Sequence, residues 1–129
     1  MMTNTVGQRE RRPKVLIVED EVLLAMLVQD MLDALGFDVG AIASSLGAAL
    51  HAGNGNDVDV AILDVNLNGR SSGPVAEILL QRGIPFIFAT GYGPLGPHDE
   101  FPSVPVLHKP FGEAELMRTL SSAMGKIGR

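Results

Sequence analysis

The run Val15-Leu16-Ile17-Val18 is apolar at every position and rich in β-branched residues, which constrains the fold more than any other feature of this chain. A strand without polar alternation is typical of a parallel sheet that is buried on both faces. Such a sheet needs helices on each side to keep it from water. The rest of the chain should therefore supply further strands and the helices that cover them.

Strand-like and helix-like segments do alternate along the remaining sequence. Apolar residues recur at helical spacing after the first run, and Gly36 is placed to end that helix. We expect further strands over residues 37–43, 58–63, 84–89 and 104–107, and helices over 23–35, 46–52, 74–82 and 113–124. Right-handed crossovers then give one doubly wound α/β domain with five parallel strands.

The two ends and one internal stretch of the chain depart from this pattern. Residues 1–13 are polar and aperiodic, so we expect a disordered N-terminal arm, a domain over 14–126 and a C-terminal tail over 127–129. The stretch between the fourth and fifth strands carries three glycines and three prolines: Gly91, Gly93, Pro94, Gly96, Pro97 and Pro102. Because a proline inside a helix costs about 3 kcal/mol, we predict a short, irregular or mobile segment there.

Charge and composition exclude several classes of protein. The first 14 residues hold four of the ten basic residues, and residues 15–129 hold six basic and fourteen acidic residues, a net charge of −8. An acidic body disfavours nucleic-acid binding, because phosphates attract Lys and Arg. The chain has no cysteine, and its longest apolar run has seven residues, from Val22 to Val28. We therefore expect no disulfides, no membrane span and a cytoplasmic location.

Polar side chains follow four of the predicted strands, at the sheet edge where ligands bind in open parallel folds. Glu19 and Asp20 follow the first strand, Asp64 the third, Thr90 the fourth and Lys109 the fifth. Three carboxylates close together repel one another unless a cation or raised pKa values relieve the repulsion. All-oxygen ligands favour Mg²⁺.

For such a Mg²⁺ ion we expect Asp20 and Asp64 as direct ligands, Glu19 as a ligand through water and the main-chain carbonyl of Asn66 as a further oxygen. Simpler roles are open for each residue taken alone. Glu19 and Asp20 suit the start of a helix, and Asp64 suits a turn.

A carboxylate beside Mg²⁺ can also act as a nucleophile towards phosphorus, which would make Asp64 the acceptor of a phosphoryl group. Lys109 and Thr90 would then contact phosphoryl oxygens, since this transfer depends on positioning and charge neutralisation. Taken singly, each suits an exposed surface position. Their joint placement at the strand ends favours the site.

The motifs Val15-Leu-Ile-Val-Glu-Asp-Glu21, Ala61-Ile-Leu-Asp-Val-Asn66 and Lys109-Pro-Phe111, with Thr90, resemble the receiver domain of response regulators. The resemblance covers about residues 14–126. It implies a CheY-like, flavodoxin-like sheet with strand order 2-1-3-4-5. It also implies a phosphoacceptor at Asp64 and an acidic pair at Glu19 and Asp20. Thr90 would be the switch hydroxyl and Lys109 the family's invariant lysine, followed by a cis peptide bond before Pro110.

Two features of this chain bear on that resemblance. Receivers commonly carry an aromatic switch residue three positions before the lysine, where this chain has Val106. The segment from Phe86 to Gly93 resembles an alphaproteobacterial subtype marked by Phe-Ala-Thr-Gly-Tyr. Tyr92 is thus the alternative switch candidate, or a loop aromatic that packs on the surface.

The resemblance implies a stand-alone response regulator of a two-component phosphorelay. It would receive its phosphoryl group from a histidine kinase or a histidine phosphotransfer protein, and then contact an output protein or pass the phosphate on as a shuttle or sink. It would catalyse only its own phosphorylation and dephosphorylation. The alternatives are a haloacid-dehalogenase-type phosphatase and a constitutive binding module. Such a phosphatase has a second acid two residues after its nucleophile, where this chain has Asn66.

Overall fold

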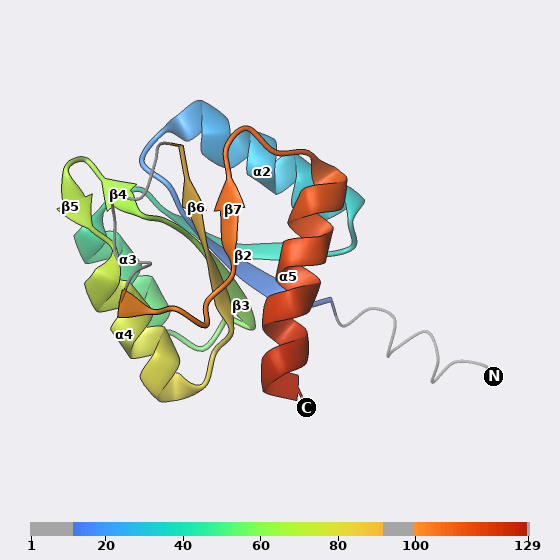
Figure 1. Ribbon diagram of the computed structural model, residues 1–129. Helices are drawn as coiled ribbons and strands as arrows, with labels where there is room; N and C mark the ends of the chain where they lie inside the picture. Colours follow the sequence, from blue (N-terminus) through green and yellow to red (C-terminus); the bar gives the residue numbers. More distant parts are fainter. Residues whose placement is uncertain (1–11, 92–99, 129) are drawn as a thin grey trace.

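A five-stranded parallel sheet lies at the centre of the computed structural model, which describes residues 12–91 and 100–128 (Figure 1). Its strands are β1 (Lys14–Val18), β2 (Asp38–Ala43), β3 (Val60–Asp64), β6 (Phe86–Thr90) and β7 (Val106–His108). They are arranged in the order β2-β1-β3-β6-β7. This is the predicted order 2-1-3-4-5, and the doubly wound, flavodoxin-like fold is confirmed.

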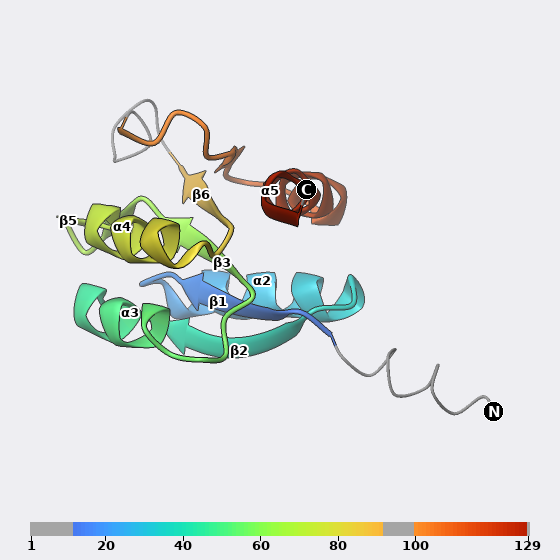
Figure 2. The ribbon, with the colours of Figure 1, turned by 90° about the horizontal axis from the view of Figure 1, so that it is seen from below.

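Helices cover both faces of the sheet. They are α2 (Val22–Ala34), α3 (Leu46–Gly53), α4 (Gly73–Arg82) and α5 (Glu113–Gly128). Apolar residues of α2 and α5 pack in one core with Ile17 and Ile62, and those of α3 and α4 pack in a second core with Leu16 and Leu63. Figure 2 shows the two pairs of helices flanking the sheet. Alternate residues of β1 thus enter opposite cores, which explains why the residues from Val15 to Val18 are all apolar.

The carboxyl ends of the central strands lie at one edge. The parallel pairing aligns Val18 with Leu63, Asp64 with Ala89 and Thr90 with His108. Residues that directly follow β1, β3, β6 and β7 are therefore neighbours in space, although the chain separates them widely. This edge is where the sequence places its candidate site.

A small antiparallel hairpin follows β3. Its strands are β4 (Asn66–Leu67) and β5 (Arg70–Ser71), with Leu67 paired to Arg70. The turn between them has positive φ at Asn68 (53°) and Gly69 (85°), as two-residue hairpin turns of type I′ require. The two short strands were not predicted from the sequence.

The predicted arm and the predicted irregular segment fall largely outside the described residues, which leave out 1–11 and 92–99. Arg12 and Pro13, assigned by sequence to the arm, contact the domain. The Arg12 guanidinium donates to the carbonyl oxygens of Asp33 and Gly36, and the carbonyl of Pro13 accepts from the amide of Asp38. Residues 100–105 contain turns and no α-helix.

The helices described between residues 12 and 128 include none that is long and apolar enough to cross a membrane.

Candidate functional site at the carboxyl edge of the sheet

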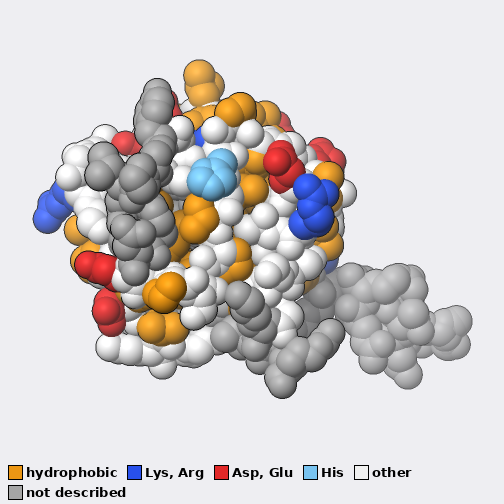
Figure 3. All heavy atoms as spheres, viewed as in Figure 1, with side chains coloured by type: hydrophobic (Ala, Val, Ile, Leu, Met, Phe, Trp, Pro, Cys, Tyr) orange, Lys and Arg blue, Asp and Glu red, His pale blue; other side chains and the backbone are white. Residues whose placement is uncertain are grey.

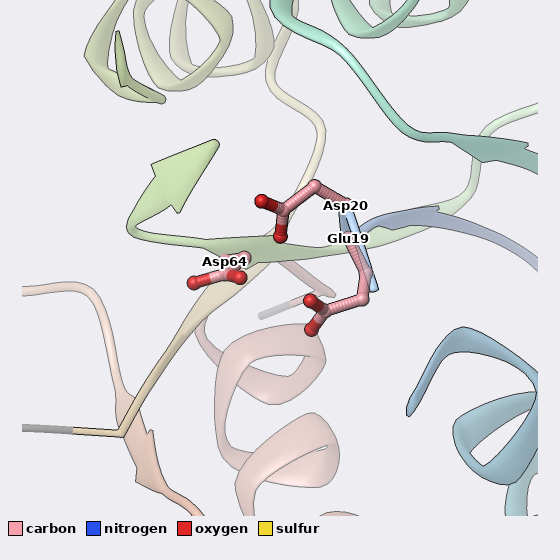
Figure 4. Close-up of side chains that lie close together, drawn as sticks. All are labelled: Glu19, Asp20 and Asp64. Carbon is pink, nitrogen blue, oxygen red and sulfur yellow. The ribbon is translucent and has the colours of Figure 1, made fainter. Parts of the chain in front are cut away.

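Three carboxylates converge at the carboxyl edge of the sheet (Figure 4). Glu19 and Asp20 follow β1, and Asp64 is the last residue of β3. One carboxylate oxygen from each lies within 4.8 Å of the other two. Glu19 and Asp64 are buried and Asp20 is half-buried. The short, fully buried strands thus bring together three acidic groups that the sequence predicts to cluster.

Lys109 supplies a positive charge to this cluster from the residue after β7. Its ammonium lies 2.9 Å from Glu19 Oε1 and 3.3 Å from Asp64 Oδ2. Its backbone amide donates to the carbonyl oxygen of Thr90, which ties it to the end of β6. The peptide bond between Lys109 and Pro110 is cis, as the resemblance implied.

The burial of this cluster alters its acid–base behaviour. Burial raises the pKa of Glu19 to about 7, and the Asp64 charge adds to the rise against the hydrogen bond from Lys109. For Lys109, burial alone would lower the pKa. The hydrogen bond to Glu19 and the charges of Asp64 and Glu19 outweigh it, so its pKa is raised. A single lysine therefore does not fully neutralise the acids.

Backbone amides near the hairpin also reach the acids. The amide of Glu21 donates to Glu19 Oε2 at 3.2 Å, and that of Asn66 donates to Asp64 Oδ1 at 3.3 Å. The amide of Asn68 donates to Asp20 Oδ2 at 3.0 Å. Sequence reasoning selected Asn66 but missed Asn68, whose Asn-Gly pair is the usual signal for a tight hairpin.

One surface pocket gathers five of the predicted site residues. Asp20, Asp64, Asn66, Thr90 and Lys109 all line it. Glu19 lies beside it, in the wall of a neighbouring apolar pocket that also contains Asp64 and Lys109. The predicted cluster is therefore one cavity in which a carboxylate, an ammonium and a hydroxyl can face the same small ligand.

Two of the three switch candidates lie among the described residues. Thr90 is buried at the end of β6, at the rim of the pocket. Val106 is half-buried in β7, where it pairs with Phe88 and packs on the second core. Tyr92 lies outside the described residues, so its switch role stays a prediction.

The donor set fits a hard divalent cation. Its ligand atoms are all oxygens, and its two buried carboxylates share one lysine, Lys109, among the residues that the structure describes. Mg²⁺ prefers such oxygen ligands and commonly keeps several waters, which the open side of the pocket allows. Asp20, Asp64 and the carbonyl of Asn66 would hold it.

Comparison with known proteins agrees with this geometry. Residues 15–121 match the family described as the response regulator receiver domain. The chain is 39% identical to SdrG from Sphingomonas melonis, with a TM-score of 0.78 over 88% of this chain and 97% of that one. No curated protein sequence matches.

Two further solved structures are similar. The receiver domain of the PhyR response regulator from Erythrobacter litoralis is 30% identical, with a TM-score of 0.74 over 88% of this chain and 91% of that one. The signal receiver domain of a modulated diguanylate cyclase from Desulfovibrio desulfuricans is 28% identical, with a TM-score of 0.80 over 92% and 98%. A family match across most of the chain, together with these neighbours, shows that the protein belongs to the response regulator receiver domain family.

Proposed function

We propose that this chain is a phosphorylation-controlled switch that accepts a phosphoryl group on Asp64 in the presence of Mg²⁺. The observation that carries the proposal is the position of Lys109, whose ammonium lies 3.3 Å from Asp64 at the floor of an open acidic pocket. Lysine and a divalent cation together suit a transferred phosphoryl group, whose oxygens carry negative charge.

The proposed transfer forms one bond to phosphorus and breaks another. An oxygen of Asp64 forms a bond to phosphorus while the bond from phosphorus to the donor's imidazole nitrogen breaks, and the leaving imidazole takes up a proton. Lys109 and the hydroxyl of Thr90 would each hold a phosphoryl oxygen. Mg²⁺, when bound, supplies the remaining charge neutralisation. The chain would act on no separate substrate, and would catalyse only its own phosphorylation and dephosphorylation.

The surface beside the pocket supports a protein as the phosphoryl donor. The first two turns of α2 expose four apolar side chains: Val22, Leu23, Met26 and Leu27. They begin two residues after Asp20, and Leu23 is 81% exposed. A cluster of exposed apolar residues is typical of a protein contact. A histidine kinase or a histidine phosphotransfer protein is the donor class that this surface and site suit.

The output would also be a contact with a protein, or the passage of phosphate to another carrier. The face of the molecule that carries β7 and α5 has apolar and uncharged atoms at its centre and most of its charges at the margins (Figure 3). Such a face lacks the dense Lys and Arg that nucleic acids require. Phosphorylation near Thr90 would shift the conformational equilibrium of the segment between β6 and β7.

A haloacid-dehalogenase-type phosphatase fits less well. That chemistry needs a second acid two residues after the nucleophile, and here this residue is Asn66. Its side-chain oxygen accepts a hydrogen bond from the Gly69 amide. Asn66 thus serves the hairpin turn and has no proton to give as a general acid.

The proposal is tested by incubating the purified chain with Mg²⁺ and a small phosphodonor, such as acetyl phosphate, and measuring its intact mass. We expect a gain of one phosphoryl group that Asp64→Asn abolishes. Asp57→Asn is the matched control, because Asp57 is exposed in the loop that precedes β3, away from the carboxyl edge. A chain that gains no mass from small donors or from any phosphorylated histidine protein would contradict the proposal.

A further inference from the structure

The hairpin β4–β5 meets the acidic pocket through the backbone amides of Asn66 and Asn68. Asn66 lies in β4, opposite Ser71 of β5, and Asn68 lies in the turn that joins the two strands. These are the two amides that reach Asp64 and Asp20.

The hairpin therefore contacts both of the carboxylates that the proposed function assigns to direct metal binding. The amide of Asn66 lies 3.3 Å from Asp64 Oδ1, and the amide of Asn68 lies 3.0 Å from Asp20 Oδ2. A backbone donor fixes a carboxylate with little loss of freedom, because the donor is already held by the fold. Asp20 needs this more than Asp64, since it is only half-buried and follows the end of its strand.

The sequence of the hairpin holds the Asn68 amide in place. Leu67 is 1% exposed in the second core, which anchors the strand below the turn. The turn itself has positive φ at Asn68 and Gly69, and the Gly69 amide donates to Asn66 Oδ1 at 2.7 Å. A shift in this turn would therefore move the donor away from Asp20.

We propose that the Asn68–Gly69 turn is a positioning device for Asp20, acting through the backbone amide of Asn68 to hold that carboxylate ready for Mg²⁺. The proposal rests on the proposed function of the site and adds a residue to it. Asn68 itself does not touch the phosphoryl group. Partners that orient metal ligands in this way commonly change metal affinity by about 10–100-fold when they are lost.

Two substitutions at Asn68 separate the backbone from the side chain. Both Asn68→Gly and Asn68→Pro remove the amide side chain, but glycine keeps the N–H and the positive φ, whereas proline removes the N–H and fixes a negative φ. Titration of each protein with MgCl₂ by calorimetry should give an affinity within about twofold of the unmodified chain for Asn68→Gly. Asn68→Pro should bind Mg²⁺ about 10-fold more weakly.

A second measurement does not depend on the proline variant folding. In the amide NMR spectrum without Mg²⁺, Asp20→Asn should shift the Asn68 amide proton and leave that of Asn66 in place. Asp64→Asn should do the reverse, because Asn66 donates to Asp64. A hairpin whose amides do not bond these two carboxylates would show no such paired response.

The outcomes distinguish this inference from the function on which it rests. If the unmodified chain binds no Mg²⁺, the metal part of the proposed function fails, and this inference fails with it. If the unmodified chain binds Mg²⁺ and Asn68→Pro binds it equally well, only the inference is overturned. An Asn68 amide that ignores Asp20→Asn would also overturn it.

Discussion

Glu19 is the most deeply buried of the three acids, with 5% of its surface exposed. The residue lies against Lys109 and near the Asp64 charge, and its folded-state pKa of about 7 stands above the ordinary value of 4.5. The folded chain therefore binds more protons than the unfolded chain between these values. Ionisation of Glu19 therefore lowers the stability of the fold when no divalent cation is bound.

The stability of the chain should depend on pH through Glu19. Because its folded pKa is raised, the stabilising contribution is complete below pH 4.5 and is lost as the pH rises to about 7. In chelator, Glu19→Gln should remove this loss and be more stable than the unmodified chain at pH 8, by about 3 kcal/mol. Urea unfolding at pH 5 and pH 8 measures the difference. Equal pH profiles for both proteins would contradict the assignment.

Helix α4 begins in an unusual way. Ser72 occupies its N-cap position, yet its side chain makes no capping bond. Its hydroxyl oxygen is buried and has no hydrogen-bond partner among the residues that the structure describes. Ser71 takes over part of the capping, because its hydroxyl accepts from the Gly73 amide at 3.0 Å. Two serines thus join the hairpin to the helix. Ser71 helps to cap the helix, whereas Ser72 buries a hydroxyl that has no partner among the described residues.

These two serines allow a matched test. Replacing an N-cap serine by alanine ordinarily costs about 1 kcal/mol of stability. We expect Ser72→Ala instead to raise the free energy of unfolding by about 1 kcal/mol, since it removes a buried hydroxyl that lacks a partner. Ser71→Ala should lower the free energy of unfolding by about 0.5–1 kcal/mol. Chemical denaturation of both variants checks the prediction, and a loss in Ser72→Ala as large as that in Ser71→Ala would refute it.

Helices α3 and α4 are joined by one arginine at their C-terminal ends. The Arg82 guanidinium donates to the carbonyl oxygens of Gly53 and Gly55, which lie at the end of α3 and just beyond it. We expect Arg82→Ala to lower the free energy of unfolding by about 1 kcal/mol. Arg82→Lys should recover most of it, because a single nitrogen, Nη1, makes both bonds and a lysine ammonium also has several N–H groups to donate. No recovery by lysine would contradict this account of the contact.

At the scale of the whole molecule, ion pairs connect three strands of the sheet at the edge where the acids meet. The carboxylates come from β1 and β3, and the lysine comes from the segment after β7. A cation bound there would connect β1 to β3 and relieve the repulsion between their acids. Metal binding and the stability of the fold should therefore be linked.

Mg²⁺ should raise the unfolding temperature of the chain. A ligand that binds only the folded state at about 100 times its dissociation constant stabilises it by about 2.7 kcal/mol. Asp20→Asn should reduce this gain strongly, because it removes one proposed ligand. Scanning calorimetry with MgCl₂, and with KCl at matched ionic strength, measures the effect. The same rise in KCl, or in Asp20→Asn, would point to screening instead.

The sequence was most informative where one physical requirement dominates. Continuous apolar runs predicted the buried strands, and polar residues at their ends predicted the cluster of Glu19, Asp20, Asp64 and Lys109. It was less informative where contacts across the chain decide. Asp59, just before β3, exchanges two hydrogen bonds with Lys14. Its Oδ2 accepts from the Lys14 amide at 2.8 Å, and its own amide donates to the Lys14 carbonyl oxygen. No local pattern reveals that pairing.

The hairpin shows a different limit. The Asn68-Gly69 pair signalled its turn, but strands of two residues each carry no periodicity to recognise. Arg12 belongs to a basic stretch and looks like part of a polar arm. Only the folded chain shows its guanidinium on the carbonyl oxygens at the end of α2.

The link between Lys109 and Glu19 spans 90 positions of the chain, and that between Lys109 and Asp64 spans 45. A nascent chain that has been synthesised only as far as β6 holds all three acids but lacks their lysine. A domain cut off before β7 would thus lack the lysine that contacts its acidic cluster. Under the proposed function, the ability to accept a phosphoryl group would then arise only once the last strand has joined the sheet.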